Sequence, residues 1–215
     1  MAFRRIFPAA LLATSLGWSS LAIGHGTEDH SADQGVSLES LPSTVGSGSG
    51  ESLPIDVGGP FELVDHLGNT VTDRSYLGKH TLVFFGYVNC KNMCSITLAR
   101  IGKALDQVEK LDKELNPIVI TVDPDRDNPT NMGPALEKYN PHLIGLSGTA
   151  EQLNVAYQAY NQKPEVIDID WDGEPIISHS SYIYLLDENG ELATFFPPIL
   201  NPASMAKIIN KYINS

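Results

Sequence analysis

The stretch HTLVFFGYVNCKNMCSITLARIGKAL, His80 to Leu105, joins a predicted strand to a predicted helix. Its first nine residues form a continuous apolar run rich in valine, phenylalanine and tyrosine, which is typical of a central strand covered on both faces. From Leu98 to Leu115, apolar residues recur every three or four positions, with charged residues between them. This spacing predicts an amphipathic helix that packs its apolar stripe on the sheet.

The rest of the chain alternates between strand and helix patterns. Residues 60–73, PFELVDHLGNTVTD, predict an N-terminal hairpin with Gly68 in its turn. After the first helix we expect a buried strand over 118–122, a short helix over 130–139 and a brief strand over 143–148. A helix over 149–162 follows and opens with a capping box. The chain then forms hairpins that turn at Asp172-Gly173 and Asn189-Gly190, and it ends with a helix over 201–213.

Strands that alternate with helices predict an α/β sandwich with a central mixed sheet flanked by helices. Ligand sites in such sheets lie outside the carboxyl ends of the parallel strands. We therefore expect Cys90, Cys94, the turn at Asp123 and the loop before Tyr182 to lie near one another.

The N-terminal segment points to export. Arg4 and Arg5 precede an apolar stretch over 6–23, and small residues follow near position 24. Residues 1–24 are thus expected to be a signal peptide or an uncleaved membrane anchor, which predicts a periplasmic protein, soluble or tethered to the inner membrane through residues 6–23. Residues 25–53 are rich in serine and glycine and are interpreted as a flexible linker, leaving 54–215 as the folded domain.

The net charge of the chain limits the classes of partner that the folded domain can bind. The chain has 14 basic and 26 acidic side chains, a formal net charge of −12. No lysine or arginine cluster occurs beyond the first few residues. Nucleic acid and anionic membrane are therefore unsuitable partners for the folded domain, and a basic protein surface suits it better.

Cys90 and Cys94 are the chain's two cysteines and lie four positions apart at the predicted start of a helix. On a helix this spacing puts both thiols on one face, where they can hold one ion or close into a disulfide. The helix N-terminus is expected to lower the thiol pKa and favour the thiolate. Redox couple, metal clamp and structural disulfide all fit, although thioredoxin-type motifs have two residues between the cysteines and this one has three.

If the site holds a metal, two soft thiolates select Cu(I) or zinc. A closed zinc site needs four ligands, whereas copper accepts three, so one histidine would complete a copper site. Of the six histidines, His179 in IISHSSYIYLL stands just before an apolar strand near the expected ligand end of the sheet.

Five segments resemble the Sco/SenC copper chaperones across residues 54–215. They are GGPFELVDHLGNTVTD, GKHTLVFFGYVNCKNMC, ITVDPDRDNP, LSGTAEQLNVAYQAY and SHSSYIYLLDENGEL. The resemblance implies a thioredoxin-like fold with an inserted hairpin before the last strands, and copper, as Cu(I) or Cu(II), held by Cys90, Cys94 and His179. It also implies a role for Asp123 beside the site, in its second coordination shell or facing a partner.

The same resemblance implies a function and a partner. Sco/SenC proteins assist copper loading of the binuclear centre of cytochrome c oxidase, so the copper-bearing subunit of that enzyme is the expected partner, with other periplasmic copper or thiol proteins as further candidates. The family loop is usually C-P-x-x-C-P, whereas Lys91 and Ser95 replace the two prolines here. The alternative function is that of a thiol-disulfide oxidoreductase that reduces the cysteines of the acceptor's copper site.

Overall fold

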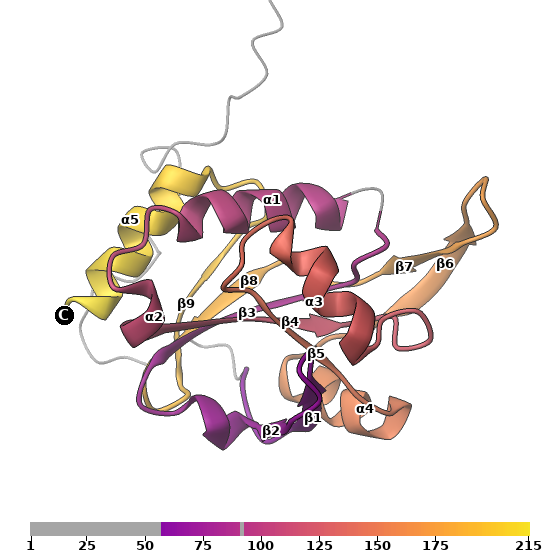
Figure 1. The fold of residues 1–215 in the computed structure, drawn as a ribbon, viewed down its shortest axis with the longest axis horizontal. Coiled ribbons are helices and arrows are strands. Elements are labelled where there is room, and N and C mark those ends of the chain that lie inside the picture. The colour runs from indigo at the N-terminus through magenta and orange to yellow at the C-terminus, as the bar shows by residue number, and fades with distance from the viewer. Residues whose placement is uncertain (1–56, 91–92) are drawn as a thin grey trace, which may run out of the picture. The chain divides into compact units, whose positions relative to one another are not determined.

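The computed structural model describes residues 57–90 and 93–215 (Figure 1). The predicted signal or anchor segment, the predicted linker and Lys91 lie outside these residues. Within the described ranges, every helix is too short or too polar to traverse a lipid bilayer.

A seven-stranded mixed sheet forms the centre of the domain, as predicted. Its strand order is β2-β1-β5-β4-β3-β8-β9, and β3, β4 and β5 are parallel while the other pairings are antiparallel. The strands of this sheet are β1 (Glu62–Asp65), β2 (Thr70–Thr72), β3 (His80–Gly86), β4 (Leu115–Thr121), β5 (Ile144–Ser147), β8 (Ile183–Leu186) and β9 (Leu192–Phe196). The expected N-terminal hairpin is confirmed as β1 and β2, and Gly68 in its turn has the left-handed φ of 89° that glycine tolerates best.

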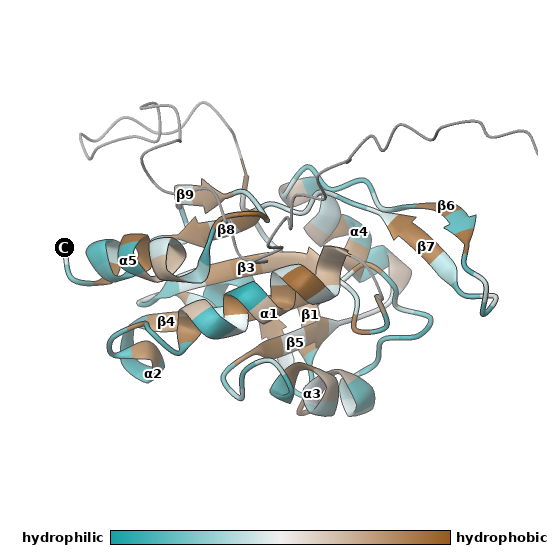
Figure 2. Cartoon of the chain, turned by 90° about the horizontal axis from the view of Figure 1, so that it is seen from above, coloured by the Kyte–Doolittle hydropathy of each residue, from teal (hydrophilic) through white to brown (hydrophobic). Residues whose placement is uncertain are grey.

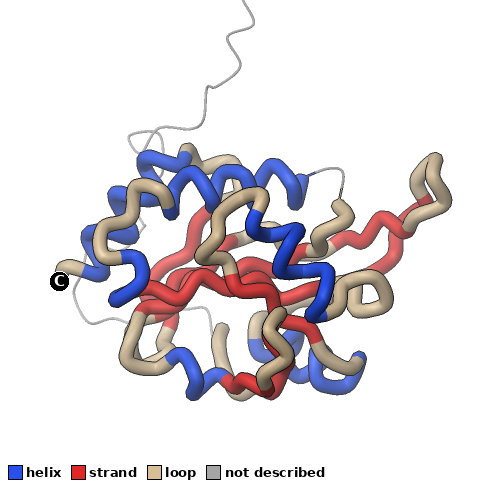
Figure 3. Tube along the Cα trace, in the orientation of Figure 1, coloured by secondary structure: helices blue, strands red, loops and turns tan. Residues whose placement is uncertain are grey.

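The helices lie on both sides of the sheet (Figures 1 and 3). They are the 3-10 helix η2 (Asp73–Tyr76) and the α-helices α1 (Met93–Leu105), α2 (Leu111–Glu114), α3 (Pro129–Glu137), α4 (Ala150–Ala159) and α5 (Pro202–Ile213). The predicted capping box at the start of α4 is confirmed, with Thr149 and Gln152 satisfying each other's backbone N–H groups.

The central strand β3 separates the two faces, because successive side chains point to opposite sides of a strand. Phe85 packs its ring against Tyr157 and Tyr160 at the α4 side, at centroid distances of 6.2 and 5.2 Å. Phe84 points the other way, toward His179. Almost every residue of β3 is buried, as the continuous apolar run predicts, and Figure 2 shows the apolar strands enclosed by helices with polar outer faces.

One predicted helix is wrong in its length. The helix expected to carry apolar residues as far as Leu115 ends at Leu105. Lys110 then adopts a left-handed φ of 53°, a conformation that interrupts a helix, and Leu115 is the first residue of β4. The apolar spacing continues through this region because Val108 is still buried against the core, although the chain is no longer helical there.

The hairpin expected before the last strands forms a separate two-stranded sheet. It consists of β6 (Glu165–Ile169) and β7 (Pro175–Ser178), which pair antiparallel with a bulge between Val166 and Asp168. Figure 1 shows this hairpin projecting from the end of the domain at which β7 leads back toward β8.

Candidate metal centre

The two cysteines lie where the carboxyl end of β3 meets the first turn of α1. Cys90 follows the strand in a turn, in which its N–H donates a hydrogen bond to the carbonyl oxygen of Tyr87 at 3.3 Å. Cys94 is the second residue of α1. Both side chains are buried, and the two cysteines are not joined by a disulfide.

His179 reaches the thiols from 85 residues further along the chain, in the loop between β7 and β8. Its Nε2 lies 3.1 Å from the Sγ of Cys94. Its Nδ1 lies 2.9 Å from the carbonyl oxygen of Ser180, which can only accept a hydrogen bond. Nδ1 therefore carries the ring proton, and the lone pair of Nε2 faces the sulfur.

Aromatic rings surround the imidazole. Phe84 and Tyr87 meet it edge to face, at centroid distances of 6.3 and 6.4 Å. Burial lowers the pKa of His179, and the hydrogen bond to Ser180 opposes this only in part. The ring is therefore neutral near pH 7, which is the form that binds metals.

The pKa of Cys94 differs from the expectation for a helix N-terminus. It is raised, first by the hydrogen bond to Cys90, then by burial and by the repulsion of a negative charge on Cys90. The prediction of a lowered pKa is thus wrong for Cys94, because a neighbouring thiol and a dry environment outweigh the helix macrodipole. The two sulfurs behave as a pair in which one negative charge disfavours a second.

Asp123 lies near the metal centre without touching it in any contact of the described residues. Its buried carboxylate is paired with the guanidinium of Arg126, and burial raises its pKa against the opposing effect of that pair. The guanidinium lies over the ring of Tyr87, 5.6 Å from its centroid. One chain of contacts thus connects Asp123 to His179 through Arg126 and Tyr87.

Tyr87 is a site residue that the sequence reasoning missed. Its hydroxyl is hydrogen-bonded to the Cys90 side chain and also accepts a bond from the N–H of Ile177, at 3.4 Å. Burial raises its pKa to about 12, so the phenol keeps its proton. Its position three residues before Cys90 is the available sequence signal, but within an apolar run a tyrosine predicts only a strand residue.

Asp127 is the second missed residue. Its fully buried Oδ2 accepts hydrogen bonds from the N–H of Val88, at 3.0 Å, and from Oγ1 of Thr121, at 2.8 Å. This carboxyl group therefore fixes the segment that leads from β3 to Cys90. Among the described residues, its Oδ1 has no hydrogen-bond partner. Its position in the acidic turn after β4 was visible in the sequence, but its burial was not.

The donor set suits a soft metal ion better than a hard one. Two thiols and a neutral imidazole match Cu(I) and other thiophilic ions. Across residues 57–90 and 93–215, no three such side chains are already placed as a complete metal site.

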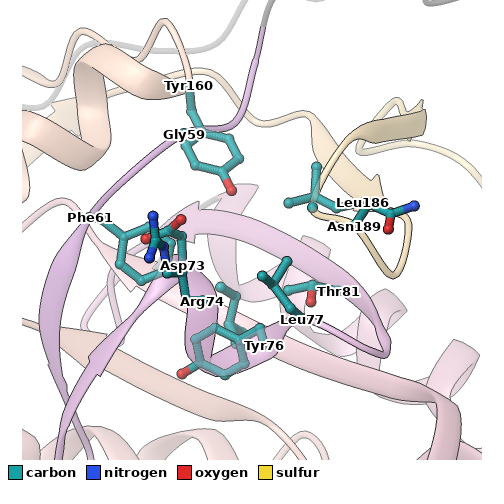
Figure 4. A pocket seen from close by; sticks show the side chains of 12 residues that line it. Gly59, Phe61, Asp73, Arg74, Tyr76, Leu77, Thr81, Tyr160, Leu186 and Asn189 are labelled. Atoms are coloured by element: carbon teal, nitrogen blue, oxygen red, sulfur yellow. The ribbon is translucent and has the colours of Figure 1, made fainter.

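A cavity of about 230 Å³ lies elsewhere in the domain (Figure 4). Tyr160 and Thr81 contribute to its wall, on the α4 side of the sheet and near the start of β3. Its lining contains neither cysteine nor His179. This cavity is therefore not part of the candidate metal site, whose two cysteines are buried at the carboxyl end of the sheet.

Known proteins are similar to this chain in sequence. The chain is 34% identical over 160 residues to protein sco1 of Schizosaccharomyces pombe, covering 73% of this chain and 60% of that protein. It is 32% identical over 164 residues to SenC of Rhodobacter capsulatus, covering 76% and 74%. The chain thus spans 60% of the length of the yeast relative, and 47% of human SCO1.

Solved structures agree on the fold. The copper-bound structure of Bradyrhizobium japonicum ScoI superposes with a TM-score of 0.67 at 36% identity, covering 73% of this chain and 99% of that one. BsSco, a member of the Sco family of cytochrome c oxidase assembly proteins with a disulfide switch, superposes with a TM-score of 0.58 at 20% identity, covering 75% and 96%. These superpositions confirm the predicted thioredoxin-like fold. The family model described as SCO1/SenC matches residues 49–214, so this chain belongs to the SCO1/SenC family.

Proposed function

We propose that this protein binds copper through Cys90, Cys94 and His179 and delivers it to the copper-bearing subunit of cytochrome c oxidase. One observation carries the proposal: the unprotonated Nε2 of His179 lies 3.1 Å from the Cys94 sulfur, which itself contacts Cys90. The copper bound to the related ScoI structure supports the choice of metal.

Three soft ligands suit a carrier. Cu(I) is stable with two or three thiolate and imidazole ligands, so an incoming acceptor thiolate can enter while one ligand leaves. His179 is the ligand best placed to leave, because it stands on a loop, whereas Cys94 is held in a helix. We propose that Asp123 acts beside the site, through its pair with Arg126.

Anaerobic titration of the reduced protein with Cu(I) against a chromophoric chelator tests the ligand set. We expect one equivalent to bind, and His179→Ala to weaken binding by at least about tenfold, because removing even a supporting partner of a metal ligand costs that much. Cys94→Ser should weaken it further. An unchanged affinity in His179→Ala would exclude the histidine from the site.

A second candidate function is thiol-disulfide exchange with the acceptor. The hydrogen bond between Cys90 and Cys94 favours it, since the sulfurs already lie within reach of each other. In this reaction the Cys90 thiolate attacks an acceptor disulfide and releases one acceptor thiolate. Cys94 then attacks the Cys90 sulfur of the mixed disulfide and releases the second, so the acceptor gains the two electrons that this protein loses. Nε2 of His179 is placed to accept the Cys94 proton.

Cys94→Ser distinguishes the two functions. If exchange occurs, this variant should accumulate a mixed disulfide between Cys90 and the oxidised acceptor, visible on a non-reducing gel. A copper chaperone without reductase activity would instead transfer copper to the reduced acceptor and leave the oxidised acceptor unchanged.

We also propose a periplasmic location, with residues 1–24 as signal peptide or inner-membrane anchor, 25–53 as linker and 54–215 as the working domain. The export pattern of the first 24 residues supports it. N-terminal sequencing of the protein from fractionated cells tests it: a soluble periplasmic form beginning near residue 25 indicates cleavage, and an intact membrane-bound form indicates an anchor. Recovery in the cytoplasm would contradict the proposal.

A further inference from the structure

The β6–β7 hairpin, residues 165–178, exposes several large apolar side chains to solvent. Every residue of β6 is exposed. Trp171 at the tip is 89% exposed, and Ile167 is 61% exposed. Large apolar side chains that are grouped on one projecting element, with no core beneath them, are typical of an interaction surface.

The same hairpin is strongly acidic. It contains no lysine, arginine or histidine, and its five carboxylates are those of Glu165, Asp168, Asp170, Asp172 and Glu174. Apolar side chains that alternate with carboxylates along one hairpin favour a partner surface that combines apolar residues with lysine or arginine.

This charge argues against three other occupants. A second copy of the chain would bring another acidic hairpin and a net charge of −12, so the two copies would repel each other. Anionic lipid and nucleic acid would be repelled for the same reason. A folded protein with a basic rim is the occupant that remains.

The hairpin is linked to the candidate metal site through Tyr87 and Arg126. The N–H of Ile177 in β7 donates to the hydroxyl of Tyr87, which is also bonded to Cys90. Arg126 pairs with Asp123 on one side and Glu174 on the other, and its Nη2 donates to the carbonyl of Pro175 at 3.1 Å. A partner held by the hairpin would therefore be held beside the thiols.

We propose that the β6–β7 hairpin is the docking arm for the protein that receives the copper, and that this partner presents an apolar patch with a basic rim next to its own metal ligands. The inference rests on the proposed copper delivery. The hairpin supplies affinity through Ile167 and Trp171 and orientation through its carboxylates.

The test uses the copper-loaded full-length protein and, as probe, the soluble copper-bearing domain of the cytochrome c oxidase subunit of the same organism, reduced and metal-free. One variant removes apolar surface, Ile167→Ser with Trp171→Ser, and one reverses charge, Asp168→Lys with Asp172→Lys. The matched controls are Leu67→Ser, which truncates a side chain that is 76% exposed on the β1–β2 turn, and Glu62→Lys with Glu137→Lys, at exposed positions.

Three quantities are measured: Cu(I) affinity, probe binding by calorimetry and the second-order rate of copper transfer. Both hairpin variants should keep the wild-type Cu(I) affinity, bind the probe at least about tenfold more weakly and transfer copper correspondingly more slowly. The controls should match the wild type. Added salt should slow the wild type more than the charge-reversed variant.

The outcomes separate the two proposals. If both hairpin variants transfer copper at the same rate as the wild type, the docking arm is overturned and the proposal of copper delivery stands. Probe binding that depends on the hairpin, without any copper transfer, supports the docking arm and contradicts delivery. A wild-type protein that neither binds the probe nor transfers copper overturns both.

Discussion

At the scale of single residues, the neighbours of His179 set the protonation state of its imidazole. Ser180 fixes the proton on Nδ1 of His179, and burial between Phe84 and Tyr87 keeps the ring neutral. The Nε2 lone pair is thus available to a metal at physiological pH without prior loss of a proton. Cys94, by contrast, must lose a proton whose release is disfavoured by Cys90 and by burial.

Tyr87→Phe tests the phenol as a partner of Cys90. Removing the hydroxyl deletes one donor to the sulfur and the acceptor for the Ile177 N–H, while the ring that packs on His179 remains. We expect Cys90 to react several-fold more slowly with iodoacetamide at pH 7, because its thiolate loses a stabilising hydrogen bond. Circular dichroism should show an unchanged fold, and an unchanged alkylation rate would contradict the contact.

Asp127→Asn tests the buried carboxyl. Burial raises the pKa of Asp127 to about 6 from an ordinary value of 3.8. A raised pKa in the folded protein means that its contribution to stability is fully present below about pH 4 and is lost as the pH rises through about 6, because the unfolded chain ionises first. The wild type should therefore lose on the order of 3 kcal/mol between these pH values through this group.

The measurement is urea denaturation of the wild type and Asp127→Asn from pH 4 to 7. The variant cannot ionise at this position, so the difference in unfolding free energy between the two proteins should change across the window and then level off. Asp125→Asn, at a neighbouring position, serves as the control. A difference that stays constant with pH would contradict the raised pKa.

At the scale of elements, the metal centre depends on how closely α1 is held. Gly102 lies on the face of α1 that meets the end of α3, and its carbonyl accepts from Nδ2 of Asn140 at 3.3 Å. A Cβ atom at this position would clash with the carbonyl oxygen of Tyr139. The close contact leaves α1 with little freedom to move, and Cys94 lies in its first turn.

Gly102→Ala should therefore destabilise the protein although alanine is the better helix former. Overpacking of a tight contact costs about 1 to 3 kcal/mol, against a gain of at most about 1 kcal/mol from helix propensity. In a chain of this size, calorimetry should show a fall in Tm of several degrees. Lys103→Ala, on the exposed face of the same helix, should leave Tm within about one degree, and an equal Tm for both variants would show that α1 can shift.

The acidic turn after β4 joins two further elements to the site. Asp127 holds the segment before Cys90, and Arg126 joins Asp123 to Glu174 on the hairpin. A single short turn thus contacts both the segment before Cys90 and the β6–β7 hairpin. Asp123 can therefore influence the position of the hairpin and of Tyr87 through Arg126, without contacting a sulfur.

At the scale of the whole molecule, metal binding and folding are coupled. The three candidate ligands come from β3's exit, α1 and a loop 85 residues away, so they come together only in the folded chain. A ligand that binds only the folded state stabilises it by about 2.7 kcal/mol when present at 100 times its Kd. Reduced protein with Cu(I) in that excess should melt roughly 5 to 10 °C higher than without it.

Differential scanning calorimetry under nitrogen measures this shift. His179→Ala should show a clearly smaller increase at the same Cu(I) concentration, because its Kd is larger. Equal shifts in the two proteins would mean that copper stabilises the fold through the cysteines alone.

Most of the architecture could be predicted from the sequence, because it depends on local periodicity and turn chemistry. The buried run from His80, the hairpin turns at Gly68, Gly173 and Gly190, and the capping box at Thr149 each specify an element within a few residues. The end of α1 at Leu105 could not be predicted, since the apolar spacing continues beyond it while the chain leaves the helix and reaches a left-handed residue at Lys110.

The sequence identifies the side chains that can carry the chemistry: two thiols at helical spacing and a histidine before a buried strand. It does not show that the Nε2 lone pair of His179 faces Cys94, that Tyr87 joins Cys90 to the hairpin, or that Asp127 is buried, and these features come from the folded arrangement. The physical reason is that protonation and hydrogen bonding depend on burial and on neighbours far away in the chain, and local sequence patterns contain neither.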